Sequence, residues 1–187
     1  MDSTVARKPW TAAELRRLPA GWRYEIDEGD LVIMSPAGRR HSRLAIRVAA
    51  ILWHFVETHH LGEVDGGELG VFFGHDPETL RGIDVAFYST ERAKRLGDAT
   101  GFVDVPPDLA VEVHDPSEPD LRRKVEQYLA AGVRSVWVLD PAAHTLTRHA
   151  PRETPQTWAD RDALVVEPVL PGFSCRLREL LGESGEA

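Results

Sequence analysis

The sequence predicts an α/β or α+β fold with a central mixed β-sheet flanked by helices. Short segments in which apolar and polar residues alternate recur along the chain, as expected for strands. One long segment, residues 41–60, instead repeats its apolar residues with the period of an amphipathic helix. A strand, a helix and a second strand follow each other closely over residues 106–140, which is the pattern of a crossover between parallel strands.

Length and composition are those of one globular domain. The 187 residues, 42% of them hydrophobic and 28% charged, predict a single domain over residues 1–187 with an ordered core from about 11 to 181. No apolar run approaches the ~18 residues of a membrane span, and the N-terminus lacks the apolar stretch of a signal peptide. The single Cys175 excludes an internal disulfide and a cysteine-rich metal site. We therefore expect a cytoplasmic protein.

The first third of the chain predicts a helix, a hairpin and a second helix. Thr11 stands three residues before Glu14, the spacing of a capping box, so a short helix is expected over 12–18. The segment "WRYEIDEGDLVIMSP" reads as a hairpin that turns at "DEGD". The helix over 41–60 carries its apolar face at Leu44, Val48, Ile51, Leu52 and Phe55.

The middle of the chain predicts further strands. The glycines in "GEVDGGELGVFFG" suggest a pair of strands joined by glycine turns. "GIDVAFYS" predicts one strand, and "ERAKRL" predicts a short helix after it. Alternation in that strand gives two faces, one with Ile83, Val85 and Phe87 and the other with Asp84, Ala86 and Tyr88.

The last third predicts the crossover unit and an edge hairpin. "PPDLAVEV" and "VRSVWVLD" are strands, and the helix between them has Ser117 as N-cap, Pro119 in its first turn, Asp120 at the capping-box spacing and Gly132 at its C-terminal end. "HTLTRHA" and "ALVVEPVL" are expected to pair as an edge hairpin, and "RLRELL" to form a last helical turn.

A carboxylate in an apolar strand is the most informative chemical feature. Glu112 stands between Val111 and Val113, where a charge is costly unless a partner compensates it. Alternation puts Glu112 on one side of its strand with His114. If the strand of Asp84 is a neighbour, both carboxylates project from one side of the sheet.

The helix that follows supplies a cation. With about 100° per residue, Lys124 lies at the edge of the apolar arc and leans toward the sheet. Two carboxylates and a lysine suit a hard divalent cation such as Mg²⁺, together with a substrate phosphate and a positioned water. A salt bridge that ties helix to sheet, with Asp84 merely at a strand end, explains the same spacing.

An ordered set of motifs carries a resemblance to a known family. These are "RYEIDEGDLVIMSP", His41, "GIDVAFYS", "PPDLAVEV", "LRRKVEQYLAAGVRSVWVLDP" and "LPGFSCRLREL". In this order, from about Thr11 to Leu181, the chain resembles the Uma-two family of restriction-endonuclease-like proteins, which belong to the PD-(D/E)XK nuclease superfamily. The resemblance implies a restriction-endonuclease-like core, a mixed β-sheet flanked by helices.

The resemblance also assigns site residues. Asp84 matches the aspartate of the PD element, although Ile83 replaces its proline, and Glu112 matches the acidic residue of the (D/E)XK strand. The superfamily's lysine would stand two residues later, where this chain has His114, and the resemblance implies that Lys124 takes its role. Asp84 and Glu112 would hold the metal, helped by the backbone carbonyl of Val113.

Three further residues are secondary candidates. Glu25 matches the acidic residue of the family's first strand, yet a solvent-facing strand glutamate is an equal alternative. His41 opens the long helix, and the resemblance suggests that it faces the site. A helix N-terminus disfavours a charged imidazole, so a neutral hydrogen-bonding or capping role is the alternative. His114 shares a face with Glu112. A local basic edge beside His41 could contact a phosphate backbone, or could be a solvated helix face; it comprises Arg39, Arg40, Arg43 and Arg47.

Two functions follow as expectations. The first is an Mg²⁺-dependent endonuclease, with Mn²⁺ as an alternative ion, that hydrolyses phosphodiester bonds of nucleic acid, DNA above all. The second is a catalytically inactive binding or regulatory protein that keeps the nuclease fold, which the net charge of −8 favours. The resemblance also implies a possible homodimer, since single domains of this superfamily often pair to cut two strands; the apolar "VWVL" strand and the C-terminal segment offer surface for it.

Overall fold

The structure is a computed structural model that describes residues 8–116 and 121–183. None of the helices in these ranges is long and apolar enough to cross a membrane. In chain order the elements are α1 (Ala12–Leu15), β1 (Arg23–Asp27), β2 (Asp30–Met34), α2 (Arg39–His59), β3 (Gly62–His75), β4 (Glu78–Ser89), α3 (Thr90–Leu96), β5 (Leu109–Val113), α4 (Leu121–Ala130), β6 (Ser135–Asp140), β7 (Thr145–His149), β8 (Gln156–Trp158), β9 (Leu164–Val166), β10 (Ser174–Arg176) and α5 (Leu177–Leu181).

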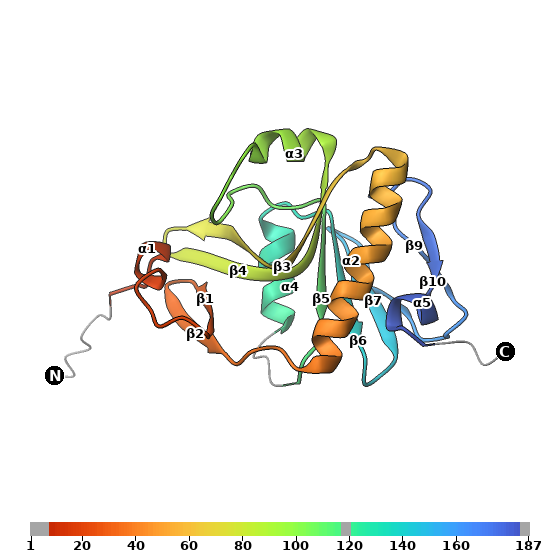
Figure 1. Cartoon of the computed structure of the whole chain (residues 1–187), viewed down its shortest axis with the longest axis horizontal. Coiled ribbons are helices and arrows are strands. Elements are labelled where there is room, and N and C mark those ends of the chain that lie inside the picture. The colour runs from red at the N-terminus through yellow and green to blue at the C-terminus, as the bar shows by residue number, and fades with distance from the viewer. Residues whose placement is uncertain (1–7, 117–120, 184–187) are drawn as a thin grey trace.

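A mixed β-sheet forms the centre of the molecule (Figure 1). Among the described residues its strand order is β2-β1-β4-β5-β6-β7-β8, and β3 pairs with β4 outside this path. β5 and β6 are parallel, and α4 connects them, so the predicted crossover unit is confirmed. The other neighbouring strands of this sheet are antiparallel.

The long strand β4 has three partners, and this creates a gap in the sheet. β3 follows one edge of β4 from Glu78 to Ser89. β1 and β5 therefore share the other edge: β1 pairs at Leu80, and β5 pairs from Val85 onward. Residues 81–84 of β4 lie between these two pairings, and we call this gap the fork. It frees the backbone groups of β4 there for contacts with side chains.

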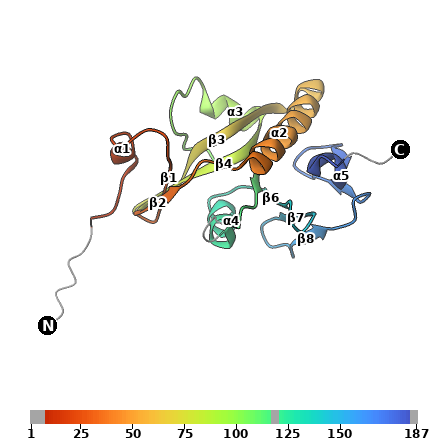
Figure 2. The same cartoon turned by 60° about the horizontal axis from the view of Figure 1, so that its bottom comes forward.

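Helices cover both faces of the sheet (Figure 2). On one face, α2 packs Val48, Leu52 and Val56 into a core that also contains buried residues of α5. On the other face, α4 packs Val125 and Tyr128 into a second core. The predicted periodicity of α2 is thus confirmed. In α4, the buried face is the one that carries Lys124.

Local sequence signals fix several element ends. Glu14 accepts hydrogen bonds from both the backbone N–H and the hydroxyl of Thr11, as the capping box predicted, although α1 ends at Leu15 rather than residue 18. Gly132, with φ of 98°, ends α4 in a Schellman motif, in which Val133 N–H donates to Tyr128 O. The predicted N-terminal cap of α4, Ser117 to Asp120, lies outside the described residues.

The segment predicted as a strand pair is one long strand with a β-bulge. In β3, Gly66 pairs with Val85 and Leu69 with Ile83, so both Gly67 and Glu68 stand opposite the single residue Asp84. Gly67 and Glu68 have φ values of 82° and 69°, which is the left-handed region. The glycines that suggested a turn instead let the strand bulge and continue.

The bulge also changes the faces of β4. The alternation predicted Ile83 on the same side as Val85 and Phe87. Instead Ile83 packs in the core beneath α4 with Ala86 and Tyr88, while Val85 and Phe87 pack beneath α2. A bulge bends and twists the ladder at one residue, and here that residue is Asp84. The prediction that Ile83 shares a face with Val85 and Phe87 was therefore wrong, because the alternation changes at Asp84.

The C-terminal pairing also differs from the expectation. β7 pairs with β8, whereas the segment at 164–166 pairs with β10 in a separate two-stranded sheet. Glu167 anchors this segment to the core, because its carboxylate accepts hydrogen bonds from Ser135 Oγ at 2.7 Å and Trp137 Nε1 at 2.6 Å. Trp137 and Leu139 have no exposed surface, so the "VWVL" strand is interior and offers no dimer surface.

Candidate functional site

The fork places Asp84 beside the end of β5. The ladder between β4 and β5 ends at Val85 and Val111, and the next hydrogen bond is made by a side chain: Val113 N–H donates to Asp84 Oδ2 at 2.8 Å. The same oxygen lies 3.1 Å from His41 Nε2. Asp84 is only 4% exposed, so both partners compensate a carboxylate that is almost removed from water.

Asp84 and His41 stabilise each other's charged forms. Burial alone would raise the pKa of Asp84, but the hydrogen bond and charge of His41, the Val113 N–H and the Lys124 charge together lower it. The hydrogen bond to Asp84 raises the pKa of His41, against the opposing effect of burial. The neutral role expected for His41 from its place near a helix N-terminus is therefore not the one that this pair favours.

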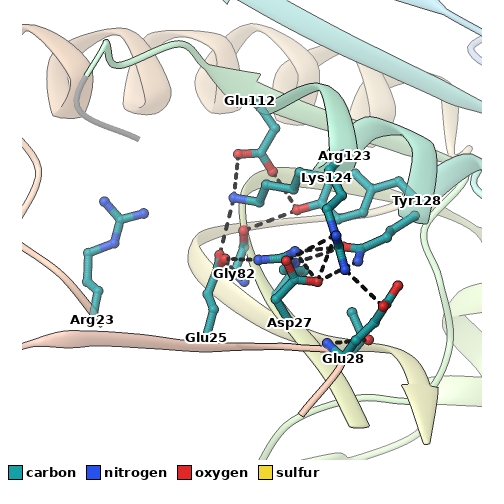
Figure 3. A network of polar contacts seen from close by, with 12 residues as sticks. Arg23, Glu25, Asp27, Glu28, Gly82, Glu112, Arg123, Lys124 and Tyr128 are labelled. Carbon is teal, nitrogen blue, oxygen red and sulfur yellow. Dashed lines mark hydrogen bonds and ion pairs between the residues drawn. The ribbon is translucent and has the colours of Figure 1, made fainter. Parts of the chain in front are cut away.

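The second part of the site is built around Lys124. Its Nζ lies 3.0 Å from Glu112 Oε2 and 3.2 Å from Glu25 Oε1, so it joins β5 to β1 across the fork (Figure 3). Lys124, Glu112 and Glu25 are 3%, 1% and 3% exposed. Of the two readings left open for Glu25, a solvent-facing residue is excluded, because its carboxylate is buried against this ammonium.

Further hydrogen bonds fix these two glutamates in place. Tyr128 OH donates to Glu112 Oε1 at 2.8 Å and lies 3.3 Å from the carbonyl oxygen of Gly82. Gly82 N–H in turn donates to Glu25 Oε1 at 2.9 Å. The backbone groups that β4 exposes at the fork are thus satisfied by site side chains. Burial and the Glu112 charge raise the pKa of Tyr128 well above its usual value, so it remains a donor.

An outer group of ion pairs holds the β1–β2 hairpin against this site. Arg81 bridges Glu25 at 3.1 Å and Asp27 at 2.8 Å. From α4, Gln127 donates to Asp27 at 2.7 Å, and Arg123 lies 3.1 Å from the same carboxylate. Burial alone would raise the pKa of Asp27, but Gln127 and Arg81 outweigh it and lower the pKa. Sequence patterns had not singled out this group.

A fourth site carboxylate, Glu68, was also missed. The bulge turns Glu68 toward Asp84, with which it shares a hydrogen bond, and Arg23 Nη2 holds it from the other side at 2.5 Å. Burial and the Asp84 charge raise the pKa of Glu68 to about 7. The paired glycines "GG" before it were the available signal, since a bulge re-aims one side chain and is frequent beside active sites.

The donor set fits a hard divalent cation. Oxygen ligands from carboxylates are what Mg²⁺ and Mn²⁺ prefer, and the fork gathers Asp84, Glu68, Glu25 and Glu112. A Cβ placed on Gly82 would come within 3.0 Å of Glu68 Oε2 and 3.6 Å of Glu25 Oε1, so only glycine leaves this space open. Burial and the Asp84 charge both raise the pKa of Glu68, and a cation bound between these two carboxylates would relieve their repulsion. As arranged here, however, residues 8–116 and 121–183 contain no group of three metal-binding side chains close enough to hold an ion.

The remaining candidates lie outside this cluster. His114 follows the end of β5, and its Nδ1 is buried without a hydrogen-bond partner in the described part of the chain. Arg40, Arg43 and Arg47 line a separate pocket of about 160 Å³ against Pro141 and Leu181. That pocket shares no residue with the one beside His41, so these three arginines line a different hollow from Asp84.

Comparisons with known proteins identify the family. The model of a family described as "Uma2: Putative restriction endonuclease" matches residues 12–178. The fold is similar to that of a putative nuclease belonging to DUF820 from Anabaena variabilis ATCC 29413, with a TM-score of 0.78 and 21% sequence identity over 94% of this chain and 99% of that one. No curated protein matches. Because the family match spans most of the 187 residues, the chain belongs to the Uma2 family of putative restriction endonucleases.

Proposed function

We propose that this chain is an Mg²⁺-dependent endonuclease that hydrolyses phosphodiester bonds of DNA at the fork. The observation that carries the proposal is the burial of Lys124 between Glu112 and Glu25, beside Asp84. A salt bridge needed only to tie α4 to the sheet requires one carboxylate. Here Lys124 contacts two buried carboxylates, and Asp84 with His41 lies in the same fork, so the site brings together the oxygen ligands that a divalent cation prefers.

Asp84 and Glu112, with the backbone carbonyl of Val113, would hold the ion, and Mn²⁺ could replace Mg²⁺ at the same oxygen ligands. When bound, such an ion polarises a phosphoryl oxygen and favours deprotonation of water. His41 would keep the Asp84 carboxylate oriented through the contact of 3.1 Å. Tyr128 would orient Glu112 in the same manner, through its hydrogen bond of 2.8 Å.

Lys124 is assigned the direct role toward substrate. Its ammonium has three donors, and two of them point at Glu112 and Glu25. Near substrate, this ammonium would contact the attacking water or a phosphate oxygen and stabilise charge that builds up during in-line attack. The reaction needs no covalent intermediate. A homodimer in the cytoplasm, with one site for each strand, completes this proposal.

A specific observation favours the second candidate, an inactive protein that binds or regulates. In the described ranges each site carboxylate already has a protein partner: Asp84 has His41, and Glu112 has Lys124 and Tyr128. With the net charge of −8, this arrangement also suits a protein whose former metal site has become a structural ion-pair network.

Cleavage assays separate the two candidates. Plasmid and single-stranded DNA are incubated with Mg²⁺ or Mn²⁺ and either the wild type, Glu112→Gln or Glu126→Gln. Glu126 lies on α4 with 62% of its side chain exposed and serves as the matched control. We expect Glu112→Gln to lower the cleavage rate at least about 100-fold, the scale on which loss of one charged site group acts, and Glu126→Gln to leave it unchanged. Equal, negligible cleavage by all three proteins would refute the nuclease and favour the regulatory protein.

A further inference from the structure

A pocket of about 490 Å³ opens beside the fork, on the α2 side of the sheet. Its size falls in the range of about 300–1,000 Å³ that small-ligand sites occupy. Asp84 is the one member of the proposed metal and lysine set that lines it, so the pocket meets the site at this carboxylate. Most of its wall is apolar and comes from the segment before β1, the β2–α2 loop and α2: Trp22, Pro36, Ala37, Ala45, Ile46 and Ala49.

The charges around the pocket indicate which part of a substrate could enter it. Asp84 and Glu68 line it, and both are carboxylates, so a phosphate group inside would meet like charge. Arg23 also lines the pocket, but its guanidinium is held by Glu68 at 2.5 Å. Apolar walls beside acceptor oxygens instead suit an uncharged, flat group with N–H donors on its edge, which describes a nucleobase.

Two side chains of the pocket, Trp22 and His41, have groups that could contact a ligand. Trp22 remains 56% exposed at the pocket, although a tryptophan gains more from burial than any smaller side chain. His41 is 8% exposed, and its Nδ1 has no hydrogen-bond partner within the described residues. An exposed aromatic ring is what proteins use to stack bases, and a buried ring nitrogen without a partner is suited to a base edge.

We propose that this pocket takes one nucleobase of the substrate strand, stacked on Trp22, while the adjoining phosphodiester stays outside the pocket, on the side of the fork. The inference rests on the proposed function, because it names the form of nucleic acid that reaches that site. A base inside a duplex is stacked and paired, and cannot enter a pocket unless it is extruded. The preferred substrate is therefore single-stranded or locally unpaired nucleic acid.

The test measures binding rather than cleavage. A labelled single-stranded oligonucleotide of about 12 nucleotides and the duplex of the same sequence are titrated with the full chain by fluorescence anisotropy, in EDTA and at low salt. The proteins compared are the wild type, Trp22→Ala, Trp22→Phe and Trp53→Ala. Trp53, on α2, is 54% exposed but does not line the pocket, so it is a matched control for an exposed tryptophan.

We expect the wild type to bind the single strand more tightly than the duplex. Trp22→Ala should raise the Kd for the single strand about 5- to 150-fold, the range that base stacking of ~1–3 kcal/mol gives. Trp22→Phe should restore most of the affinity, since a phenyl ring still stacks, and Trp53→Ala should change the Kd less than about twofold. Circular dichroism of each variant checks that the substitution leaves the fold intact, as expected for exposed positions.

Three outcomes would overturn the inference. One is unchanged affinity in Trp22→Ala. Another is an equal loss in Trp53→Ala, which would show a general apolar surface rather than a base pocket. A third is a change of oligomeric state in Trp22→Ala by light scattering, which would make the pocket a contact between copies of the chain. Trp22-dependent binding without any cleavage would refute the proposed nuclease but keep the base pocket.

Discussion

Replacement of Lys124 by methionine tests the central contact of the site. Methionine keeps the apolar stem of the side chain in the α4 core but removes the ammonium between Glu112 and Glu25. Glu25 keeps Arg81 at 3.1 Å and the N–H of Gly82 at 2.9 Å. Glu112 keeps the hydroxyl of Tyr128, which is neutral. The substitution therefore removes the ammonium partner of the Glu112 carboxylate, which is only 1% exposed.

The expected cost follows from that burial. Removal of one partner of a buried ion pair costs about 3–5 kcal/mol, because the remaining charge is still held away from water. The cost should depend on pH. Without the ammonium, Glu112 takes up a proton more readily in the folded than in the unfolded state. When the pKa of a carboxyl is higher in the folded than in the unfolded state, the protein becomes less stable as pH rises above the unfolded-state pKa, about 4.3 for Glu. The loss of unfolding free energy in Lys124→Met should therefore be larger at pH 8 than at pH 5.

Urea unfolding of the wild type and of Lys124→Met at both pH values measures this difference. Lys94→Met, at an exposed position of α3, controls for loss of a lysine as such. The double variant Lys124→Met/Glu112→Gln should recover about 1–3 kcal/mol at pH 8, because the carboxylate that lost its ammonium partner is then replaced by a neutral amide. A cost below about 1 kcal/mol that does not vary with pH would refute the reasoning, since Glu112 would then be compensated by something other than Lys124.

Other contacts at the fork give further predictions. By NMR, His41 should titrate with a pKa above 6.5, and Asp84→Asn should lower that pKa. The pair stabilises the fold fully below about pH 6.5, and this stabilisation is lost as pH rises through the pKa of His41 in the folded state. Glu68, with a pKa of about 7, should make the fold less stable as pH rises from 4.5 to about 7, and Glu68→Gln should remove that part of the pH dependence. Gly67→Ala should cost about 1–2 kcal/mol in urea unfolding, because its φ is 82°, whereas Gly66→Ala meets only ordinary contacts and should cost less than about 0.5 kcal/mol.

Local patterns were sufficient for most helices and strands and for part of the site. Lys124 could be placed at the sheet-facing edge of α4 because helical geometry fixes its direction relative to Val125 and Tyr128. Glu112 drew attention because a charge in an apolar strand needs a partner. Both inferences depend on residues close together in the chain, and in the structure these two side chains lie 3.0 Å apart.

What the sequence did not reveal depends on long-range pairing. Paired glycines are compatible with a turn or a bulge, and only the pairing of β3 with β4 decides that Gly67 and Glu68 form a bulge opposite Asp84. The fork likewise exists because β1 and β5 share one edge of β4, which no local pattern encodes. Glu68 escaped notice for this reason, since its local sequence does not reveal which strand it faces.

Because of the fork, loss of activity in a variant of this protein can arise from a loosened hairpin as well as from a lost reacting group. β1 shares a single residue pair with β4, Ile26 with Leu80, so side chains carry much of the attachment of the β1–β2 hairpin. Two of those side chains are Glu25 and Asp27, beside the apolar packing of Ile26, and their partners belong to the site or lie next to it. A substitution intended to stop chemistry would therefore also loosen the hairpin, which connects the pocket residues Trp22 and Pro36 along the chain. Hydrogen exchange of residues 23–34 would distinguish a variant that has lost only a reacting group from one in which the β1–β2 hairpin has detached from the sheet.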